Sequence, residues 1–303
     1  MTRVAVLYGG ISAEREVSLS SGAQCIAALR TAGYDVTPID VGPDLRATLA
    51  ALDPAPDCVF NALHGRFGED GTMQGVLDWL GIPYTHSGVR ASALAMDKVA
   101  ARAVFTAAGI PMARARVVAA ASLAHEEPMT RPFVIKPINE GSSVGVHIFR
   151  DGDNRVAEIA RTWTFGTEML VEEYIPGREL TVGVMDDAAL CVTEIGSSRS
   201  DFYDYDAKYA AGGSRHTLPA EIPEDVSTRA CEIAVAAHRA LGCRGATRAD
   251  FRYHDATGRI ALLEVNTQPG LTPTSLLPEQ AAYRGIDFPS LCAWMVRHAA
   301  CRV

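Results

Sequence analysis

Two runs near the C-terminal end of the chain carry oxygen-bearing side chains at every second position. The first run holds Arg248 and Asp250, and the second holds Glu264 and Asn266. Residues two apart on a strand point to the same face, and the short segment 255–258 between the runs predicts an antiparallel hairpin. Three oxygen donors would then meet beside one arginine, a set that suits Mg²⁺ bound jointly with nucleotide phosphates. Solvated charges on a strand face are the alternative.

A lysine and a glycine–serine loop form a second candidate site. Lys136 ends an apolar strand pattern, where a cation is costly without an anionic partner. The loop at residues 140–145 has two glycines and two serines, so its backbone N–H groups can approach phosphate oxygens. This loop matches neither the Walker pattern nor Gly-x-Gly-x-x-Gly, and a plain hairpin turn explains it equally well.

A third segment has groups that suit a nucleoside. Glu172, Tyr174 and Ile175 lie where an apolar strand pattern ends, and Glu179 follows shortly after. Such a strand exit could present backbone groups to an adenine edge and the Glu179 carboxylate to ribose hydroxyls. From these residues alone, an exposed turn is the better explanation.

The first third of the chain predicts a parallel sheet. Apolar strand patterns alternate with helix patterns, which favours a sheet with its ligand site at the carboxyl ends of the strands. Two glycine-containing loops, at Gly9-Gly10 and His64-Gly65, follow the two strand patterns and should lie at that edge. The predicted strands are residues 4–7 and 57–63, and the predicted helices are 18–32 and 73–80.

The rest of the chain predicts two mixed units. The middle unit has strands at 133–136 and 146–148, which form a hairpin around the glycine–serine loop, then a helix at 154–163 and a strand at 169–172. The last unit has strands at 181–185, 189–195, 247–253 and 259–265, with helices at 224–241 and near the C-terminus. The expected fold class is therefore α/β with additional α+β units.

Length and composition exclude several classes of protein. A chain of 303 residues with 48% hydrophobic and 21% charged residues predicts a globular protein of two or three domains. A net charge of −8 without a basic stripe argues against nucleic acid as a partner. No apolar run reaches the roughly 20 residues that span a bilayer, and the N-terminus lacks a signal-peptide pattern, so a cytoplasmic location is expected. Seven scattered cysteines predict reduced, mostly buried thiols.

Together these patterns resemble the ATP-grasp superfamily, and further runs narrow the resemblance to the D-alanine:D-alanine ligase family. The resemblance covers essentially the whole chain in the family's order. The additional runs are residues 9–18, 64–71, 96–98, 203–209 and 266–270. The resemblance implies a substrate-binding α/β domain at 1–96, a central ATP-grasp domain at 97–180 and a C-terminal catalytic domain at 181–303.

The resemblance also implies how ATP is bound, between the central and C-terminal domains. Two Mg²⁺ ions, or Mn²⁺ in their place, would neutralise phosphoryl charge. Lys98, which would otherwise be assigned to a helix surface, joins Lys136 at the phosphates, and Tyr174 stands where many relatives have tryptophan. The implied ATP and metal residues are Lys98, Lys136, Glu172, Tyr174, Ile175, Glu179, Asp250, Glu264 and Asn266.

For D-alanine, the resemblance implies an acyl phosphate of the first molecule, which the amine of the second attacks. Glu14 would hold the first ammonium, and Ser142 and Tyr209 would bond Glu14 and close a lid. Arg248 and the Gly270 N–H would stabilise the oxyanion. The second carboxylate would be bound by Lys208, Ser275 and the backbone of Leu276, and His64 would orient substrate, although a lone histidine is more often structural. A homodimer is implied as well.

Three alternatives compete with this resemblance. A D-alanine:D-lactate ligase shares the chemistry but commonly departs from the Lys208–Tyr209 pair, which is intact here. An inactive ATP-binding module would be expected to have lost metal ligands, which are all present. A dinucleotide-binding dehydrogenase does not fit, because its glycine fingerprint is absent.

Overall fold

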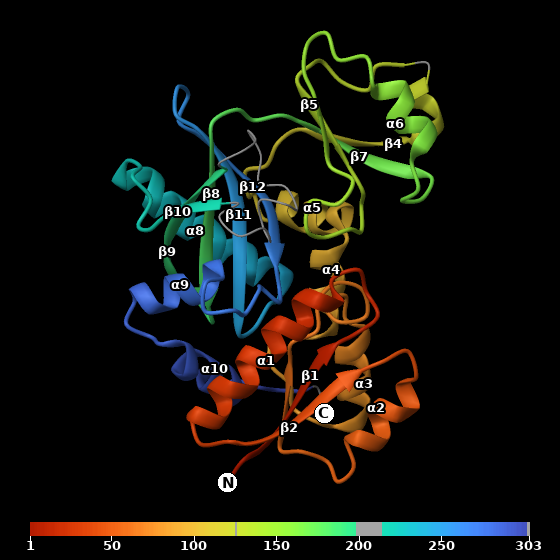
Figure 1. Ribbon diagram of the computed structural model, residues 1–303. Helices are drawn as coiled ribbons and strands as arrows, with labels where there is room; N and C mark the ends of the chain where they lie inside the picture. The colour runs from red at the N-terminus through yellow and green to blue at the C-terminus, as the bar shows by residue number, and fades with distance from the viewer. Residues whose placement is uncertain (125, 198–213, 302–303) are drawn as a thin grey trace.

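The computed structural model describes residues 1–124, 126–197 and 214–301, which form three units, each built on its own sheet (Figure 1). The first sheet has three strands in the order β2-β1-β3, the second four in the order β4-β7-β5-β6, and the third five in the order β10-β9-β8-β11-β12. The predicted α/β class with a parallel N-terminal sheet and mixed later units is confirmed.

The N-terminal sheet is parallel throughout. Strand β1 (Arg3–Gly9) pairs with β2 (Asp35–Val41) and with β3 (Cys58–Asn61). Strands β1 and β3 therefore end at the same edge, and the two glycine-containing loops follow them there, as predicted. The helices of this unit are α1 (Arg15–Thr31), α2 (Leu45–Ala51) and α3 (Thr72–Leu80). The sequence did not predict β2, an edge strand that contains Pro38 and has mostly exposed residues.

Helices α4 (Val89–Met96) and α5 (Lys98–Ala107) lead into the middle unit. Its sheet consists of β4 (Ala115–Ala119), β5 (Phe133–Lys136), β6 (His147–Phe149) and β7 (Glu168–Glu173). The predicted hairpin is confirmed, because β5 and β6 are antiparallel around the glycine–serine loop. A 3-10 helix (Ala120–Ala124) and α6 (Val156–Thr162) complete the unit.

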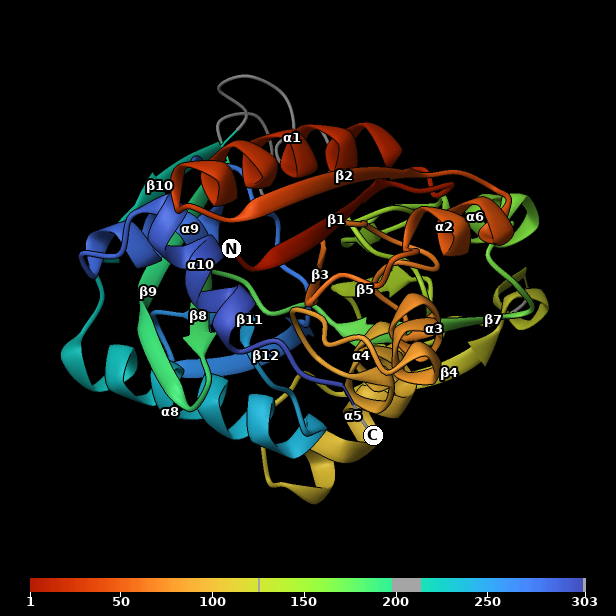
Figure 2. The same cartoon turned by 90° about the horizontal axis from the view of Figure 1, so that it is seen from below.

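The third sheet is antiparallel and carries helices on both faces. Its strands are β8 (Arg178–Met185), β9 (Ala188–Ser197), β10 (Ser214–Thr217), β11 (Ala246–His254) and β12 (Arg259–Asn266). Val182 and Val184 pack with α8 (Glu224–Leu241), whereas Gly183 between them faces α9 (Leu276–Tyr283) (Figure 2). Alternate residues of one strand thus contact helices on opposite sides.

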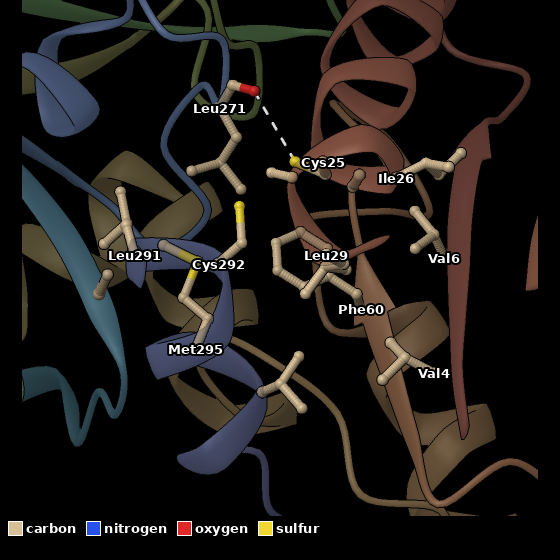
Figure 3. Close-up of a cluster of buried hydrophobic side chains, with 14 of the residues drawn as sticks. Val4, Val6, Cys25, Ile26, Leu29, Phe60, Leu271, Leu291, Cys292 and Met295 are labelled. Atoms are coloured by element: carbon tan, nitrogen blue, oxygen red, sulfur yellow. Dashed lines mark hydrogen bonds between the residues drawn. The ribbon is translucent and has the colours of Figure 1, made fainter. Parts of the chain in front are cut away.

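The last helix, α10 (Phe288–Arg297), packs against the first unit. Leu291, Cys292 and Met295 share one hydrophobic cluster with Leu29 of α1 and Phe60 of β3 (Figure 3). The two ends of the chain therefore share one hydrophobic core. No helix in the described ranges is long and apolar enough to cross a membrane.

Candidate active site

A cleft of about 840 Å³, open to solvent, is lined by residues of the four-stranded and five-stranded sheets and by Lys98 of α5. Its walls mix aliphatic side chains with charged groups, as in many sites for small ligands. It is lined by Lys98, Ala113, Val134, Lys136, Pro137, Glu140, Gly141, Ser143, Val144, Val146, Glu172, Glu173, Tyr174, Ile175, Glu179, Asp250, Arg252, Leu263 and Glu264. Eight residues predicted for ATP or metal are among them.

Lys136 and Glu172 form a buried ion pair in this cleft. They lie on neighbouring strands, β5 and β7, and Lys136 Nζ is 2.5 Å from Glu172 Oε2. The other carboxylate oxygen, Oε1, accepts a 2.8 Å hydrogen bond from Arg102 on α5. Glu172 is only 4% exposed, so the exposed turn favoured by the sequence is wrong at this position. Two cations held here offset the cost of burying one carboxylate.

Lys98 reaches the cleft from the first position of α5. Asp97 caps this helix by accepting hydrogen bonds from the N–H groups of Val99 and Ala100. The Lys98 ammonium donates a hydrogen bond to the Glu140 carbonyl oxygen and lies 4.0 Å from Glu264 Oε2. The Lys98 side chain is only 12% exposed, and it joins the glycine–serine loop to the β11–β12 hairpin.

The β11–β12 hairpin has the predicted register. Arg248 pairs with Asn266, and Asp250 pairs with Glu264 across the ladder. Arg248 forms two hydrogen bonds with the Asp250 carboxylate, at 2.9 and 2.7 Å, and Asn266 Nδ2 donates to the same group at 3.0 Å. Asp250 is 7% exposed and also accepts a hydrogen bond from the Thr181 hydroxyl. The Arg248–Asp250 pair is therefore not a solvated pair of surface charges. The side chains of Arg248, Asp250 and Asn266 therefore meet on one face of the hairpin, and Glu264 lies opposite Asp250 in the ladder.

The donor set suits an ion shared with a ligand. Within the described residues, no group of three or more His, Cys, Asp or Glu side chains could hold a metal. Two carboxylates and one amide are too few to enclose Mg²⁺, but Mg²⁺ commonly takes one or two carboxylates and completes its shell with phosphate and water. The residues therefore fit Mg²⁺ only together with a phosphate-bearing ligand.

The segment between β7 and β8, residues 174–177, contributes Tyr174 and Ile175 to the wall of the cleft. Arg252 of β11 donates hydrogen bonds to the carbonyl oxygens of Ile175 at 3.0 Å and Gly177 at 2.7 Å. Its Nη1 lies 3.6 Å from Glu179 Oε2, and its guanidinium carbon is 5.6 Å from the centroid of the Tyr174 ring. Tyr174, in this segment, and Glu179, in β8, both line the cleft, and Arg252 ties the segment to the five-stranded sheet.

Glu14 links the first unit to the glycine–serine loop. It precedes α1 at the carboxyl edge of the parallel sheet, and its carboxylate accepts a hydrogen bond from the Ser142 hydroxyl. Close approach to glycine permits this position, because a Cβ added at Gly65 would lie 2.5 Å from Glu14 Oε2. Glu14 also lies beside Gly141, where an added Cβ would be 3.8 Å from Glu14 Oε2, and Gly141 lines the large cleft.

The remaining predicted residues fall into three groups. Ser275 is the residue before α9, whose first helical residue is Leu276, and its side chain makes no capping hydrogen bond; a Cβ added at Gly270 would lie 3.3 Å from Ser275 Oγ. The backbone N–H groups at such a helix start suit a carboxylate. The ring of His64 is 6% exposed, and its nitrogens lie 2.9 Å from Glu69 and 3.1 Å from Ser21.

Lys208 and Tyr209 lie outside the described residues.

Two site residues escaped the sequence analysis. Arg102 lies on a helix 70 residues before its partner Glu172, and no local pattern signals that pairing. Arg252 did leave a signal, because it continues the period of two set by Arg248 and Asp250. An arginine at the third position of such a run could have been assigned to the cleft.

Comparison with known proteins gives matches over nearly the whole chain. The family model described as D-ala D-ala ligase N-terminus matches residues 3–51 and 43–87, and the one described as D-ala D-ala ligase C-terminus matches residues 99–297. The chain is 70% identical to the D-alanine--D-alanine ligase of Acidiphilium cryptum over 303 residues, which cover 100% of both chains. It is 70% identical to that of Granulibacter bethesdensis, covering 99% of this chain and 98% of the relative.

Solved structures match as well. A D-alanine--D-alanine ligase of Bacillus anthracis superposes with a TM-score of 0.85 at 32% identity, covering 98% of this chain and 97% of the other. A second structure of a ligase of that name and organism, complexed with ATP, gives a TM-score of 0.83 at 29% identity and the same coverage.

Proposed function

The chain belongs to the D-alanine--D-alanine ligase family, and from this premise we propose that it joins two D-alanine molecules with ATP, for cell-wall precursor synthesis. One observation carries the proposal. Lys98, Lys136, Asp250 and Glu264 line one cleft, and Arg248 bonds Asp250, so the groups that we propose for phosphate and for metal lie in one space.

The proposed reaction activates a carboxylate, because a carboxylate is a poor electrophile. A carboxylate oxygen of the first D-alanine attacks the γ-phosphorus of ATP, and the bond to the β–γ bridging oxygen breaks, which releases ADP and leaves an acyl phosphate. The neutral amine of the second D-alanine then attacks the acyl carbon. The tetrahedral intermediate collapses with loss of phosphate, and the amine gives up its proton.

Charge stabilisation falls to groups that are already held in position. The ammonium groups of Lys98 and Lys136 would contact ATP phosphates, aided by the N–H groups of the 140–145 loop. Asp250, Glu264 and Asn266 would hold Mg²⁺, or Mn²⁺ in its place, which when bound neutralises phosphate charge. Arg248, together with the Gly270 N–H, would stabilise the oxyanion.

ATP would lie along the length of the cleft. We propose that the base contacts Glu172 and the backbone near Tyr174 and Ile175, and that the ribose hydroxyls bond Glu179. The buried state of Glu172 and the position of Glu179 in the cleft support this assignment. The triphosphate would then extend toward Lys98 and Glu264.

The two D-alanines would occupy the far end, beyond the phosphates. Glu14, joined to Ser142, would bind the first ammonium. The second carboxylate would bind at the start of α9, at Ser275 and the Leu276 N–H, with Lys208. We propose that His64 helps to orient the substrate by holding its own loop in place, because its ring nitrogens contact Glu69 and Ser21. Tyr209 would complete the contact with Glu14.

The decisive experiment is direct. Purified protein is mixed with ATP, Mg²⁺ and D-alanine, with D-lactate as a competitor, and ADP, phosphate, dipeptide and ester are quantified. We expect dipeptide equal to ADP and negligible ester. ATP hydrolysis without dipeptide, or abundant D-alanyl-D-lactate at neutral pH, would contradict the assignment.

We divide the chain into domains at 1–96, 97–180 and 181–303, with α10 crossing back onto the first. We expect a homodimer, on the family resemblance, which sedimentation velocity would test. The reaction is assigned to the cytoplasm, where ATP is available, and fractionation of cells would test this.

A further inference from the structure

We propose that Arg252 is a positioning residue of the nucleotide site, which aligns Glu179 and the 174–177 segment so that the site distinguishes ribose from deoxyribose. The inference rests on the proposed function, because it takes the cleft to be the ATP site. It adds a residue that the sequence pattern left without a role and assigns it a part in nucleotide specificity.

Arg252 is a buried cation whose contacts all lie on one wall of the cleft. Only 6% of the residue is exposed. Its Nε donates to the Ile175 carbonyl oxygen at 3.0 Å, and its Nη2 donates to the Gly177 carbonyl oxygen at 2.7 Å. Its Nη1 is 3.6 Å from Glu179 Oε2. One side chain thus joins two backbone groups of the segment to the carboxylate that follows it.

The chemistry of the guanidinium explains why arginine suits this position. A buried cation needs partners on all sides, and the planar guanidinium has five N–H donors in a fixed fork. Such a fork fixes the relative orientation of its acceptors, which a single ammonium on a flexible stem does not. The Tyr174 ring centroid, 5.6 Å from the guanidinium carbon, adds a further contact on the same segment.

Alignment of Glu179 matters because recognition of a hydroxyl depends on geometry. A carboxylate favours ribose over deoxyribose only if it is held where the ribose hydroxyl will lie. A misplaced carboxylate can accept hydrogen bonds from water instead. The Glu179 side chain is only 10% exposed and has an arginine beside it. Without Arg252, this carboxylate would lose its arginine neighbour, and the 174–177 segment would lose two hydrogen bonds.

The test compares nucleotides in wild type, Arg252→Met and Arg252→Lys, with kcat and KM measured for ATP, 2′-deoxyATP and 3′-deoxyATP. We expect the preference for ATP over the deoxynucleotides to fall by about tenfold or more in both variants, as for loss of one charge-assisted hydrogen bond. The KM for D-alanine should stay unchanged. A general loss of stability would instead lower activity with every nucleotide equally.

A matched control is available on β8, the strand that pairs with β11. Arg178 bonds the Glu194 carboxylate through its Nε at 2.7 Å and neighbours Glu179 in sequence, but it does not line the cleft. Arg178→Met should leave the nucleotide preference unchanged. In addition, Glu179→Gln combined with Arg252→Met should lower the preference no further than Glu179→Gln alone, because both changes remove one function.

Calorimetric titration with ATP and 2′-deoxyATP separates this inference from the proposed function, since binding needs no turnover. A wild type that binds ATP but forms no dipeptide would contradict the ligase assignment only. An Arg252→Lys variant that folds and keeps the wild-type nucleotide preference would overturn the role of Arg252, whatever the reaction.

Discussion

The Ser142 hydroxyl donates a hydrogen bond to the Glu14 carboxylate across 128 residues of sequence. This contact joins the glycine–serine loop of the middle unit to the carboxyl edge of the parallel sheet. Both groups belong to loops, and Ser142 has a φ of 50°, a left-handed conformation that few residues other than glycine adopt readily. The loop is therefore held in a particular shape where it meets the first unit.

The first prediction separates the Ser142 hydroxyl from its backbone conformation. Ser142→Ala removes the hydroxyl, and Ser142→Gly removes it while favouring the positive φ. If the hydrogen bond to Glu14 matters, both variants should lower dipeptide formation about tenfold and raise the ratio of ADP to dipeptide, as the acyl phosphate reacts with water. Normal activity in the glycine variant would mean that only backbone shape is required.

The second prediction concerns the metal-binding hairpin. Glu264→Gln keeps the side-chain shape but removes a negative charge, so the Mg²⁺ concentration for half-maximal turnover should rise at least about tenfold. Its thermal midpoint should change little, because the Glu264 side chain is 30% exposed. Asp250→Asn should lose activity and stability together, since Asp250 is buried beside Arg248. Unchanged Mg²⁺ dependence in Glu264→Gln would place the ion elsewhere.

The third prediction tests Arg248 as an oxyanion donor. Loss of such a donor lowers kcat by about 10²- to 10³-fold, with a smaller effect on the KM for ATP. Because Arg248 also bonds Asp250, we include Arg248→Lys, which retains a positive charge near that carboxylate. Steady-state kinetics of both variants would check this. A rise confined to the KM for ATP would assign Arg248 to nucleotide binding.

The fourth prediction concerns stability at acid pH. Burial, reinforced by the neighbouring His64, lowers the pKa of His86 from 6.5 to about 3. Between these values the unfolded chain binds a proton that the folded protein does not, so the contribution of His86 to the free energy of unfolding is fully present well above pH 6.5 and falls by about 1.4 kcal/mol per pH unit from pH 6.5 down to about pH 3.

His86→Phe keeps a ring beside Phe60, which now lies edge-on to His86, and removes the titrating group. Urea unfolding at neutral pH and at about pH 5.5 should show a smaller loss for the variant, by about 1 kcal/mol. An equal loss in both proteins would exclude His86 as a source of acid sensitivity.

The fifth prediction concerns the junction of the two chain ends. Leu291 of α10 is fully buried against the first unit, so Leu291→Ala should lower the free energy of unfolding by about 2–5 kcal/mol. Leu80→Ala is the matched control, because Leu80 is 42% exposed and should change stability by less than about 0.5 kcal/mol. Equal losses measured by chemical denaturation would show that α10 is not integral to that core.

Local patterns determined much of the architecture from the sequence alone. The alternation at 248–252 and 260–266 predicted the hairpin and its shared face, because the side-chain period of a strand follows from backbone geometry. The 133–136 strand and the 224–241 helix also have the predicted bounds. The family resemblance rested on spaced motifs, which need no structure to be read.

Only the tertiary structure decided which distant residues meet. Arg102 with Glu172, Glu14 with Ser142, and Leu291 with Leu29 are pairs whose separation carries no periodic signal. Their contacts depend on how complete units pack, and packing is the sum of many weak, non-directional interactions along surfaces that no short window of sequence contains. For the same reason, the sequence could not tell that Glu172 is buried between two cations rather than exposed in a turn.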